Sequence, residues 1–388
     1  MLTPDAPALL PEAFQSLPDP RQGNATRHPF FEILFMALCA TLAGADGFEE
    51  IGRWAECNHS WLERHLTLPN GIPSPDTFRR VFAALSPQAF GDCFLAWTRE
   101  IAQSKTEEII AIDGKTLRRS GDAPKDIAPL HLVSAWATKN RLVLAQQGVK
   151  EKENEIVAIP RLLEMLNLKN SIVTIDAMGC QIEIAKQITE SEGEYLLALK
   201  GNHGILHERV VDFFESERAR NWKTSYGDDI AHSFCQTLDK GHGRLEIRRC
   251  WVVDEAQWLD IPDERGESFG FQSVVCIESE RHLREKVSIE SRYFLSSLPA
   301  EAPRALRAAR HHWGIENRLH WVLDVCFDED RCRVRDEQAR YNLALLRQVS
   351  INLLNREKTA KGGVKGKRKR AAWNVDYLLK ILAAPETP

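Results

Sequence analysis

Apolar residues recur with the period of an α-helix over roughly the first hundred positions of the chain. This pattern predicts helices at residues 29–43, 47–57 and 60–66. Two further helices carry explicit start signals, because Ser74-Pro75 and Ser86-Pro87 each supply a capping hydroxyl followed by proline at the first helical position. Residues 1–104 are therefore predicted to form a helical domain.

The pattern changes from residue 107 onward, where short apolar runs bounded by turn residues replace the helical period. Strands are predicted at 107–113, 130–138, 142–149, 171–176 and 194–200, and helices at 154–168 and 179–190. The order is three strands, helix, strand, helix, strand. It is typical of an RNase H-like sheet in which the first and fourth strands are adjacent. The predicted fold class is therefore α/β, with an RNase H-like mixed sheet flanked by helices.

A helix at 204–221 precedes a long β-rich stretch. Strands are predicted there at 230–238, 244–253, 271–279 and 287–295. These strands predict a β-rich insertion at about residues 222–298. After it come helices at 310–330 and 336–355, a basic linker and a short helix near 375–382. The chain is thus predicted to have three parts, a helical domain at 1–104, an α/β domain at 105–356, and a basic linker with a short helix at 357–388.

The stretch Arg310–Asp330, RHHWGIENRLHWVLDVCFDED, is predicted to be a helix carrying one conspicuous carboxylate, Glu316. A helical period places Glu316 on one face with Trp313, His320 and Leu323. A second face carries apolar residues, at Ile315, Leu319, Val322 and Cys326. A helix that only packs would leave Glu316 in water, so a functional role depends on partner carboxylates elsewhere in the chain.

Composition indicates an ordinary globular protein of 388 residues with 43% hydrophobic residues and a net charge of −4. The longest apolar run, 30–44, is shorter than the roughly 20 residues that span a bilayer. No secretory signal pattern opens the sequence. Nine scattered cysteines without a Cys-x-x-Cys pair indicate reduced thiols, and we expect a cytoplasmic protein without a membrane partner.

Three carboxylates occur at positions suited to one cleft. Asp113 and Asp176 end two predicted strands, and ligands bind at the carboxyl edge of open α/β sheets. Glu316 lies on the later helix. Three clustered carboxylates repel one another, and a divalent cation removes that conflict. Oxygen ligands favour Mg²⁺ or Mn²⁺, and two such ions about 4 Å apart suit phosphoryl transfer on nucleic acid.

Cationic segments supply candidate phosphate contacts. Between Arg356 and Arg370 there are eight Lys or Arg residues and one acid. Lys115 follows Asp113, and the turn 239–244 is basic and glycine-rich. Neutralisation of phosphates by Lys and Arg supplies most non-specific affinity for nucleic acid. A solvated surface, or for the turn a simple hairpin, is the alternative interpretation.

Five ordered segments give the sequence a specific resemblance. AIDGKTLRRS, TIDAMGCQ, YLLALKGNHG, GHGRLEIRR and HHWGIENRLHWVLDVCFDED resemble the signature segments of the H-repeat-associated DDE transposases of bacterial insertion sequences. The resemblance implies an RNase H-like core whose catalytic, metal-binding triad is Asp113, Asp176 and Glu316. It also implies an associated amino-terminal domain and a β-insertion between the second and third acids. For the amino-terminal domain, DNA docking and mere packing or dimerisation both remain open.

One departure concerns the residues around Glu316. Related transposases place a tyrosine, an arginine and a lysine there, whereas this sequence has Ala309, His312 and Leu323. Phosphate contacts must then come from other residues. The candidate DNA-binding residues are Lys115, Lys200, His242, Arg244, Arg310, His312, Arg318, His320, Lys367 and Arg368.

The expected function is DNA transposition with Mg²⁺ or Mn²⁺ as cofactor, two ions being the expectation. The partners implied are double-stranded DNA, as the element's terminal inverted repeats and as target DNA, and a second copy of the chain in the synaptic complex. Such a protein would act at the bacterial nucleoid. Two alternatives stay open: a domesticated or inactive DNA-binding protein, and a metal-dependent nuclease that does not join strands.

Overall fold

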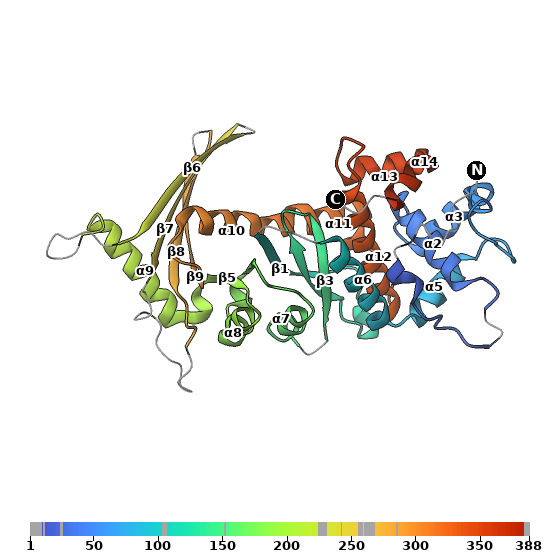
Figure 1. Ribbon diagram of the computed structural model, residues 1–388, viewed down its shortest axis with the longest axis horizontal. Helices are drawn as coiled ribbons and strands as arrows, with labels where there is room; N and C mark the ends of the chain where they lie inside the picture. Colours follow the sequence, from blue (N-terminus) through green and yellow to red (C-terminus); the bar gives the residue numbers. More distant parts are fainter. Residues whose placement is uncertain are drawn as a thin grey trace. The chain divides into compact units, whose positions relative to one another are not determined.

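The computed structural model describes most of the chain (Figure 1). The described residues are 10, 12–23, 26–102, 107–150, 153–223, 231–241, 243–254, 259, 268–284 and 286–383. The chain divides into two compact units. We call residues 104–113 and 154–315 the sheet unit, and residues 1–103, 114–153 and 316–388 the helical unit. Strand β1 (Glu108–Thr116) passes from the first into the second between Asp113 and Gly114.

The sheet unit is built on three parallel strands. β1 pairs in parallel with β4 (Ser171–Ile175), and β4 pairs in parallel with β5 (Glu194–Leu199). The connecting helices are α7 (Glu155–Glu164) and α8 (Ile182–Glu190). β1 and β4 pair directly, so the predicted adjacency of the first and fourth strands is confirmed. Parallel neighbours need a crossover connection, and α7 and α8 lie in the connections that lead to β4 and β5.

A long helix, α10 (Ala302–Ile315), covers the other face of these strands (Figure 1). Its Ala305, Leu306 and Ala309 share a buried cluster with Ile109 of β1 and Ile172 of β4. Small side chains on this helix let its backbone approach the sheet closely. The sheet therefore fixes the position of α10 up to its last turn.

The predicted β-rich insertion continues the same sheet. Its strands are β6 (Ser233–Gly241), β7 (Arg244–Asp254), β8 (Ser273–Leu283) and β9 (Lys286–Ser296), preceded by helix α9 (Gly204–Ala219). β9 pairs antiparallel with β5. With β2 (His131–Ala137) and β3 (Leu142–Val149) at the other edge, the strand order is β3-β2-β1-β4-β5-β9-β8-β7-β6. The predicted fold class, an α/β mixed sheet flanked by helices with a β-rich insertion, is confirmed.

The helical unit is organised around α12 (Glu337–Arg356), which is buried along most of its length. The elements that pack directly on it include α2 (Phe30–Leu42), α5 (Pro75–Ala84), α6 (Pro87–Ile101) and β3 (Leu142–Val149). α1 (Glu12–Gln15) packs on α6, α3 (Phe48–Cys57) packs on α2 and α5, α4 (His59–Leu62) packs on α3, and β2 (His131–Ala137) pairs antiparallel with β3. Asn342 donates to the carbonyl oxygens of Phe82 (2.9 Å) and Leu85 (2.8 Å). Asn352 pairs with both backbone groups of Val143 at 2.8 Å. Two buried amides thus join α12 to the amino-terminal helices and to the hairpin.

The predicted helix starts at Ser74 and Ser86 are confirmed. Each hydroxyl accepts a hydrogen bond from a backbone N–H three residues later, and proline follows at the first helical position. All nine cysteines carry free thiols. Among the described residues, no helix combines the length and the apolarity that a membrane crossing needs.

The second half of the predicted basic linker is a helix, whereas residues 357–363 connect α12 to it. Val364–Trp373 forms α13, which packs with α14 (Val375–Leu382). Lys367 and Arg368 on α13 are buried. Lys367 Nζ donates to the carbonyl of Leu354 at 2.7 Å and also to the carbonyl of Glu357. The charge in this stretch therefore serves packing as well as the surface.

Arg368 ties α13 to the end of α2. Its guanidinium donates to the carbonyl of Thr41 at 2.8 Å and of Ala45 at 3.1 Å, and to Asp46 Oδ1 at 2.9 Å. It also lies 4.0 Å from the ring centroid of Phe327. A planar five-donor group suits such a site because it satisfies several acceptors at once. Removing it leaves these acceptors without their donor.

Replacing Arg368 by methionine should lower the free energy of unfolding by about 3 kcal/mol, because Asp46 and two carbonyls lose their donor in a largely buried site. Urea unfolding followed by circular dichroism measures the change. Lys369→Met, which removes the neighbouring exposed cation, is the matched control and should change stability by less than about 0.5 kcal/mol. Equal effects of the two substitutions would contradict this role of Arg368.

Candidate active site

Asp113 and Asp176 follow directly after two paired positions of adjacent parallel strands. The register pairs Ile112 of β1 with Ile175 of β4. Neighbouring strands lie about 4.8 Å apart, and residues in register share one face of the sheet. The register therefore brings the two carboxylates together just beyond the last paired residues of β1 and β4. β1 itself continues to Thr116, so the predicted end of this strand at Asp113 is wrong. Both aspartates are half-buried.

The local backbone fixes Asp176 further. Its side chain caps the short helical turn Ala177–Gly179 and accepts a hydrogen bond from the N–H of Met178 at 3.1 Å. Gly179 is required at the end of this turn, because a Cβ there would collide with the side chain of Ile175. Oδ1 of Asp176 therefore binds the backbone of the turn, and this bond holds the side chain next to the end of β4.

α10 lies on the face of the sheet to which both aspartates belong. Side chains alternate along a strand, so Ile172, Thr174 and Asp176 share a face, and Ile172 packs against α10. The Nδ1 atom of His312 on α10 lies 3.1 Å from the hydroxyl oxygen of Thr174. Burial lowers the pKa of His312, although the charge of Asp176 opposes this effect. His312 is therefore a neutral imidazole at neutral pH, and it anchors the last turn of α10 beside Asp176.

Glu316 is the first residue after α10, one helical turn beyond His312. It opens a π-helical segment, Glu316–His320, which is followed by α11 (Trp321–Phe327). The Glu316 side chain is exposed. π-helical turns are rare and occur frequently at functional sites. Glu316 belongs to the helical unit, whereas Asp113 and Asp176 belong to the sheet unit. Its role as third ligand stays a prediction.

The π-helical segment changes which side of this helix is buried. The sequence placed Leu323 on the face of Glu316 and placed Val322 and Cys326 on the apolar face. Instead, Leu323 is buried, together with Ile315, Leu319 and Phe327. The wider π turn shifts the later residues around the axis, so the buried stripe follows a spacing of four. This correction leaves Glu316 away from the buried stripe.

Lys115 lies in a cluster of carboxylates inside the helical unit. Its Nζ is 2.5 Å from Asp324 Oδ1, 2.9 Å from Glu329 Oε2 and 3.8 Å from Asp330 Oδ1. Burial would lower the pKa of Lys115, but the charges and hydrogen bonds of Glu329 and Asp324 outweigh it and raise the pKa. The lysine side chain is 12% exposed and Glu329 is 2% exposed. This geometry favours a structural role for Lys115 over a contact with phosphate.

The three acids that follow α11, at positions 328 to 330, also have partners inside the helical unit. Glu329 also lies 3.6 Å from Arg347, which is buried in α12. Asp330 accepts from the N–H of Arg118 at 3.4 Å, and Asp328 lies 3.6 Å from Arg331. Each of these three carboxylates therefore has a cationic or N–H partner inside the helical unit. The sequence did not single out Asp324 as a partner of Lys115, because only the fold brings them together.

The remaining predicted DNA-binding residues lie in different environments. Arg310 pairs with Asp239 at 2.9 Å, and Arg244 lies 3.5 Å from Glu246. Lys200 and Arg318 are exposed, and His320 is half-buried in the π-helical segment. His242 lies outside the described residues. Lys367 and Arg368 are buried as described above, so the structure favours packing roles for both.

Within the described residues, no group of three or more His, Cys, Asp and Glu side chains has the arrangement of a metal site. The pair Asp113 and Asp176 nevertheless supplies oxygen donors at one sheet edge. Oxygen-only donors suit Mg²⁺ or Mn²⁺ and do not suit a structural zinc site.

Known proteins are similar to this one over nearly the whole chain. The family model described as DDE_Tnp_1-associated matches residues 11–98, and that described as Transposase DDE domain matches residues 104–353. The "H repeat-associated putative transposase YhhI" of Escherichia coli (strain K12) is 36% identical over 96% of this chain and 97% of its own length. The "Putative transposase YncI" of Escherichia coli O157:H7 is 39% identical over 95% of this chain and 93% of its own length.

Among solved structures, a piggyBac transposase synaptic complex with hairpin DNA aligns with a TM-score of 0.44 and 12% sequence identity. The alignment covers 97% of this chain and 78% of that one. From the two family models and the near full-length relatives, the chain belongs to the DDE transposase family, among its H repeat-associated members.

Proposed function

We propose that this protein is an active transposase that binds the ends of its own insertion sequence and moves them to target DNA. The observation that carries the proposal is the register of β1 and β4, in which Asp113 and Asp176 directly follow the paired residues Ile112 and Ile175. Water would first cleave the phosphodiester at each element end and leave a 3′-hydroxyl. That hydroxyl would then attack a target phosphodiester, form the new phosphodiester bond and displace the target's own 3′-oxygen.

Asp113, Asp176 and Glu316 are the residues that would hold the metal. Two Mg²⁺ or Mn²⁺ ions, when bound, would activate the attacking oxygen and stabilise the leaving oxygen. These residues suit a divalent metal ion because two neighbouring carboxylates repel each other unless a cation or a proton lies between them. The hydrogen bond from the Met178 N–H holds the Asp176 carboxylate in one orientation at the end of β4.

His312 is proposed to position the third acid. It occupies the place where related transposases carry an arginine. Its imidazole is neutral and meets Thr174, so it does not add positive charge beside the carboxylates. The contact fixes α10 one turn before Glu316. In this proposal His312 holds the last turn of α10 against β4, and cationic residues bind the phosphates.

The partners follow from the reaction. Double-stranded DNA enters as the terminal inverted repeats and as the target, and two copies of the chain are proposed to hold two ends in one synaptic complex. A cytoplasmic location at the nucleoid is part of the same proposal. The amino-terminal helices α2 to α6 are proposed to dock on DNA, and the division at 1–104, 105–356 and 357–388 remains a proposal about domains.

Replacing Asp113 or Asp176 by asparagine, or Glu316 by glutamine, should lower the rate of end cleavage at least about a thousandfold, because an amide keeps the shape but cannot neutralise a cation. The measurement uses a labelled duplex that carries the inverted repeat flanking the gene, with Mg²⁺ present. Chelation of Mg²⁺ should abolish cleavage by the unchanged protein.

Binding of the same duplex, measured by fluorescence anisotropy without divalent ions, is the control and should not weaken in these variants. Cleavage retained by any one variant would remove that residue from the triad. A supercoiled plasmid in the reaction separates the alternatives, because a nuclease without joining activity would release cut ends and form no plasmid-linked product.

Lys115→Met should lower the free energy of unfolding by about 3 kcal/mol, because Glu329 and Asp324 lose their buried cation. The affinity of the folded protein for duplex DNA should stay unchanged, since the lysine is nearly covered. Urea unfolding and anisotropy measure the two quantities. Lys150→Met, at an exposed position, serves as the matched control. A folded Lys115→Met variant with weakened DNA binding would instead favour a direct phosphate contact.

A further inference from the structure

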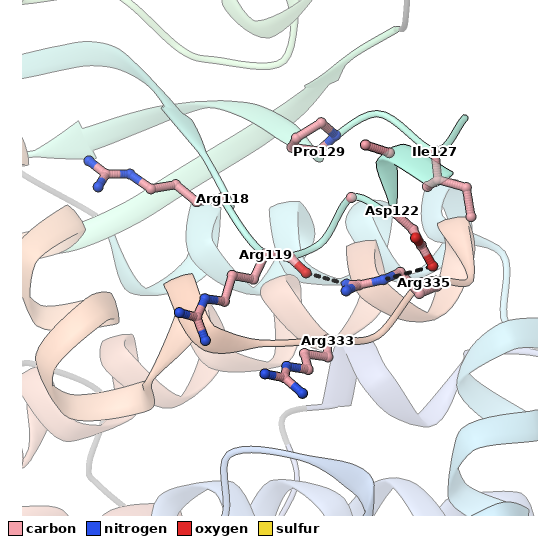
Figure 2. Close-up of a pocket in the computed structure, with 9 residues that line it drawn as sticks. Arg118, Arg119, Asp122, Ile127, Pro129, Arg333 and Arg335 are labelled. Carbon is pink, nitrogen blue, oxygen red and sulfur yellow. Dashed lines mark hydrogen bonds and ion pairs between the residues drawn. The ribbon is translucent and has the colours of Figure 1, made fainter. Parts of the chain in front are cut away.

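A pocket of about 480 Å³ in the helical unit is lined by arginines from two distant segments of the chain (Figure 2). The first segment follows β1, and the second joins α11 to α12. The lining residues are Arg118, Arg119, Gly121, Asp122, Ala123, Ile127, Pro129, Arg333 and Arg335. None of its four arginines is among the residues that the sequence pattern singled out for DNA binding.

The wall after β1 is a tightly bonded loop. Ser120 Oγ accepts from the N–H of Leu130 and donates to the carbonyl of Leu117, both at 2.7 Å. Gly121 approaches the opposite side of the loop so closely that a Cβ would lie 2.8 Å from the carbonyl oxygen of Ile127. Arg340 of α12 donates to the carbonyl of Ser120 at 3.1 Å. The loop is therefore held in shape before any ligand arrives.

The second wall is fixed at both of its ends. At one end Glu329 is buried between Lys115 and Arg347. At the other end Asp336 caps α12 by accepting from the N–H of Ala339 at 2.8 Å. Arg333 and Arg335 lie between these two points. Their backbone is thus anchored although the Arg333 side chain is exposed.

The charges in the pocket do not balance. Arg335 lies 3.8 Å from Asp122 and donates to the carbonyl of Arg119, and Arg118 lies 3.5 Å from Asp330. Within the part of the chain that the structure describes, the guanidinium groups of Arg119 and Arg333 make no ion pair. Figure 2 shows both turned away from the Arg335–Asp122 pair. Two uncompensated guanidinium groups on a rigid frame suit an anion, and their planar forks match a phosphate.

We infer that this pocket binds backbone phosphates of the duplex DNA on which the protein acts, through Arg119 and Arg333. The inference rests on the proposed function for the identity of the anion. Contacts to backbone phosphates do not depend on base sequence, so the pocket holds the duplex whatever its sequence.

The test is the double variant Arg119→Gln with Arg333→Gln. Its affinity for a 30-base-pair duplex of arbitrary sequence is measured by fluorescence anisotropy at several salt concentrations, without divalent ions. Loss of two phosphate contacts should flatten the slope of log affinity against log salt by about 2. Affinity at low salt should fall about tenfold or more, and equally for different sequences. Both side chains are exposed, so thermal unfolding of the variant should match that of the unchanged protein.

The control is Lys150→Gln with Lys380→Gln, which removes two exposed cations outside the pocket and outside the amino-terminal helices. An equal loss of affinity in this control would show an effect of net charge and overturn the inference. So would an unchanged salt slope in the pocket variant. A shift in unfolding temperature on adding inorganic phosphate, without any change in DNA affinity between the proteins, would assign the pocket to a small anion and also overturn it.

The outcome is separable from that of the proposed function. DNA binding that depends on Arg119 and Arg333, without any Mg²⁺-dependent cleavage, would leave the pocket standing and contradict the proposed reaction. Cleavage that depends on Asp113 and Asp176, with DNA affinity indifferent to the two arginines, would do the reverse.

Discussion

The parallel register between β1 and β4 is the constraint on which the candidate active site depends. It pairs Ile112 with Ile175 and so leaves Asp113 and Asp176 at neighbouring positions on one face. A slip of one residue would turn Asp176 to the opposite face of the sheet. The register is strongly specified because the strand residues before the two acids are buried, and either face would lose apolar contacts on slipping. The apolar core therefore determines the distance between two charged groups.

α10 transmits that constraint along the chain. It packs small side chains against the sheet and ends with His312 hydrogen-bonded to Thr174. Glu316 follows without a loop, so few rotatable backbone bonds separate it from an anchored residue. The neutral imidazole at position 312 holds this end of the helix without adding charge beside the acids. In the proposed function, phosphate binding and positioning of the acid are therefore divided between different residues.

Burial separates the cations of this chain into two groups. Lys115, Lys367 and Arg368 are surrounded by carboxylates and carbonyl oxygens, and they hold segments together. Arg119 and Arg333 lie on anchored backbone with their guanidinium groups in solvent. A cation that is already compensated has little to gain from a phosphate, whereas an uncompensated one gains a counterion. The second group is where an anionic partner is expected to bind.

The sequence by itself determined most of the elements and placed the two aspartates on adjacent strands. Period and capping are local properties, so the starts at Ser74 and Ser86 and the strands leading to Asp113 and Asp176 could be predicted from neighbouring residues. The π-helical turn that begins at Glu316 could not be predicted, because its residues do not differ in type from those of an ordinary helix. Leu323 was consequently placed on the wrong face.

Only the tertiary structure decided what each cation does. Lys115 and Glu329 are 214 residues apart in sequence, and Arg368 meets Thr41 across 327 residues. Nothing near a lysine or arginine in the sequence indicates whether a carboxylate from so far away will cover it. A local pattern predicts backbone conformation, whereas the role of a charge depends on desolvation and partners, which exist only once the chain has folded.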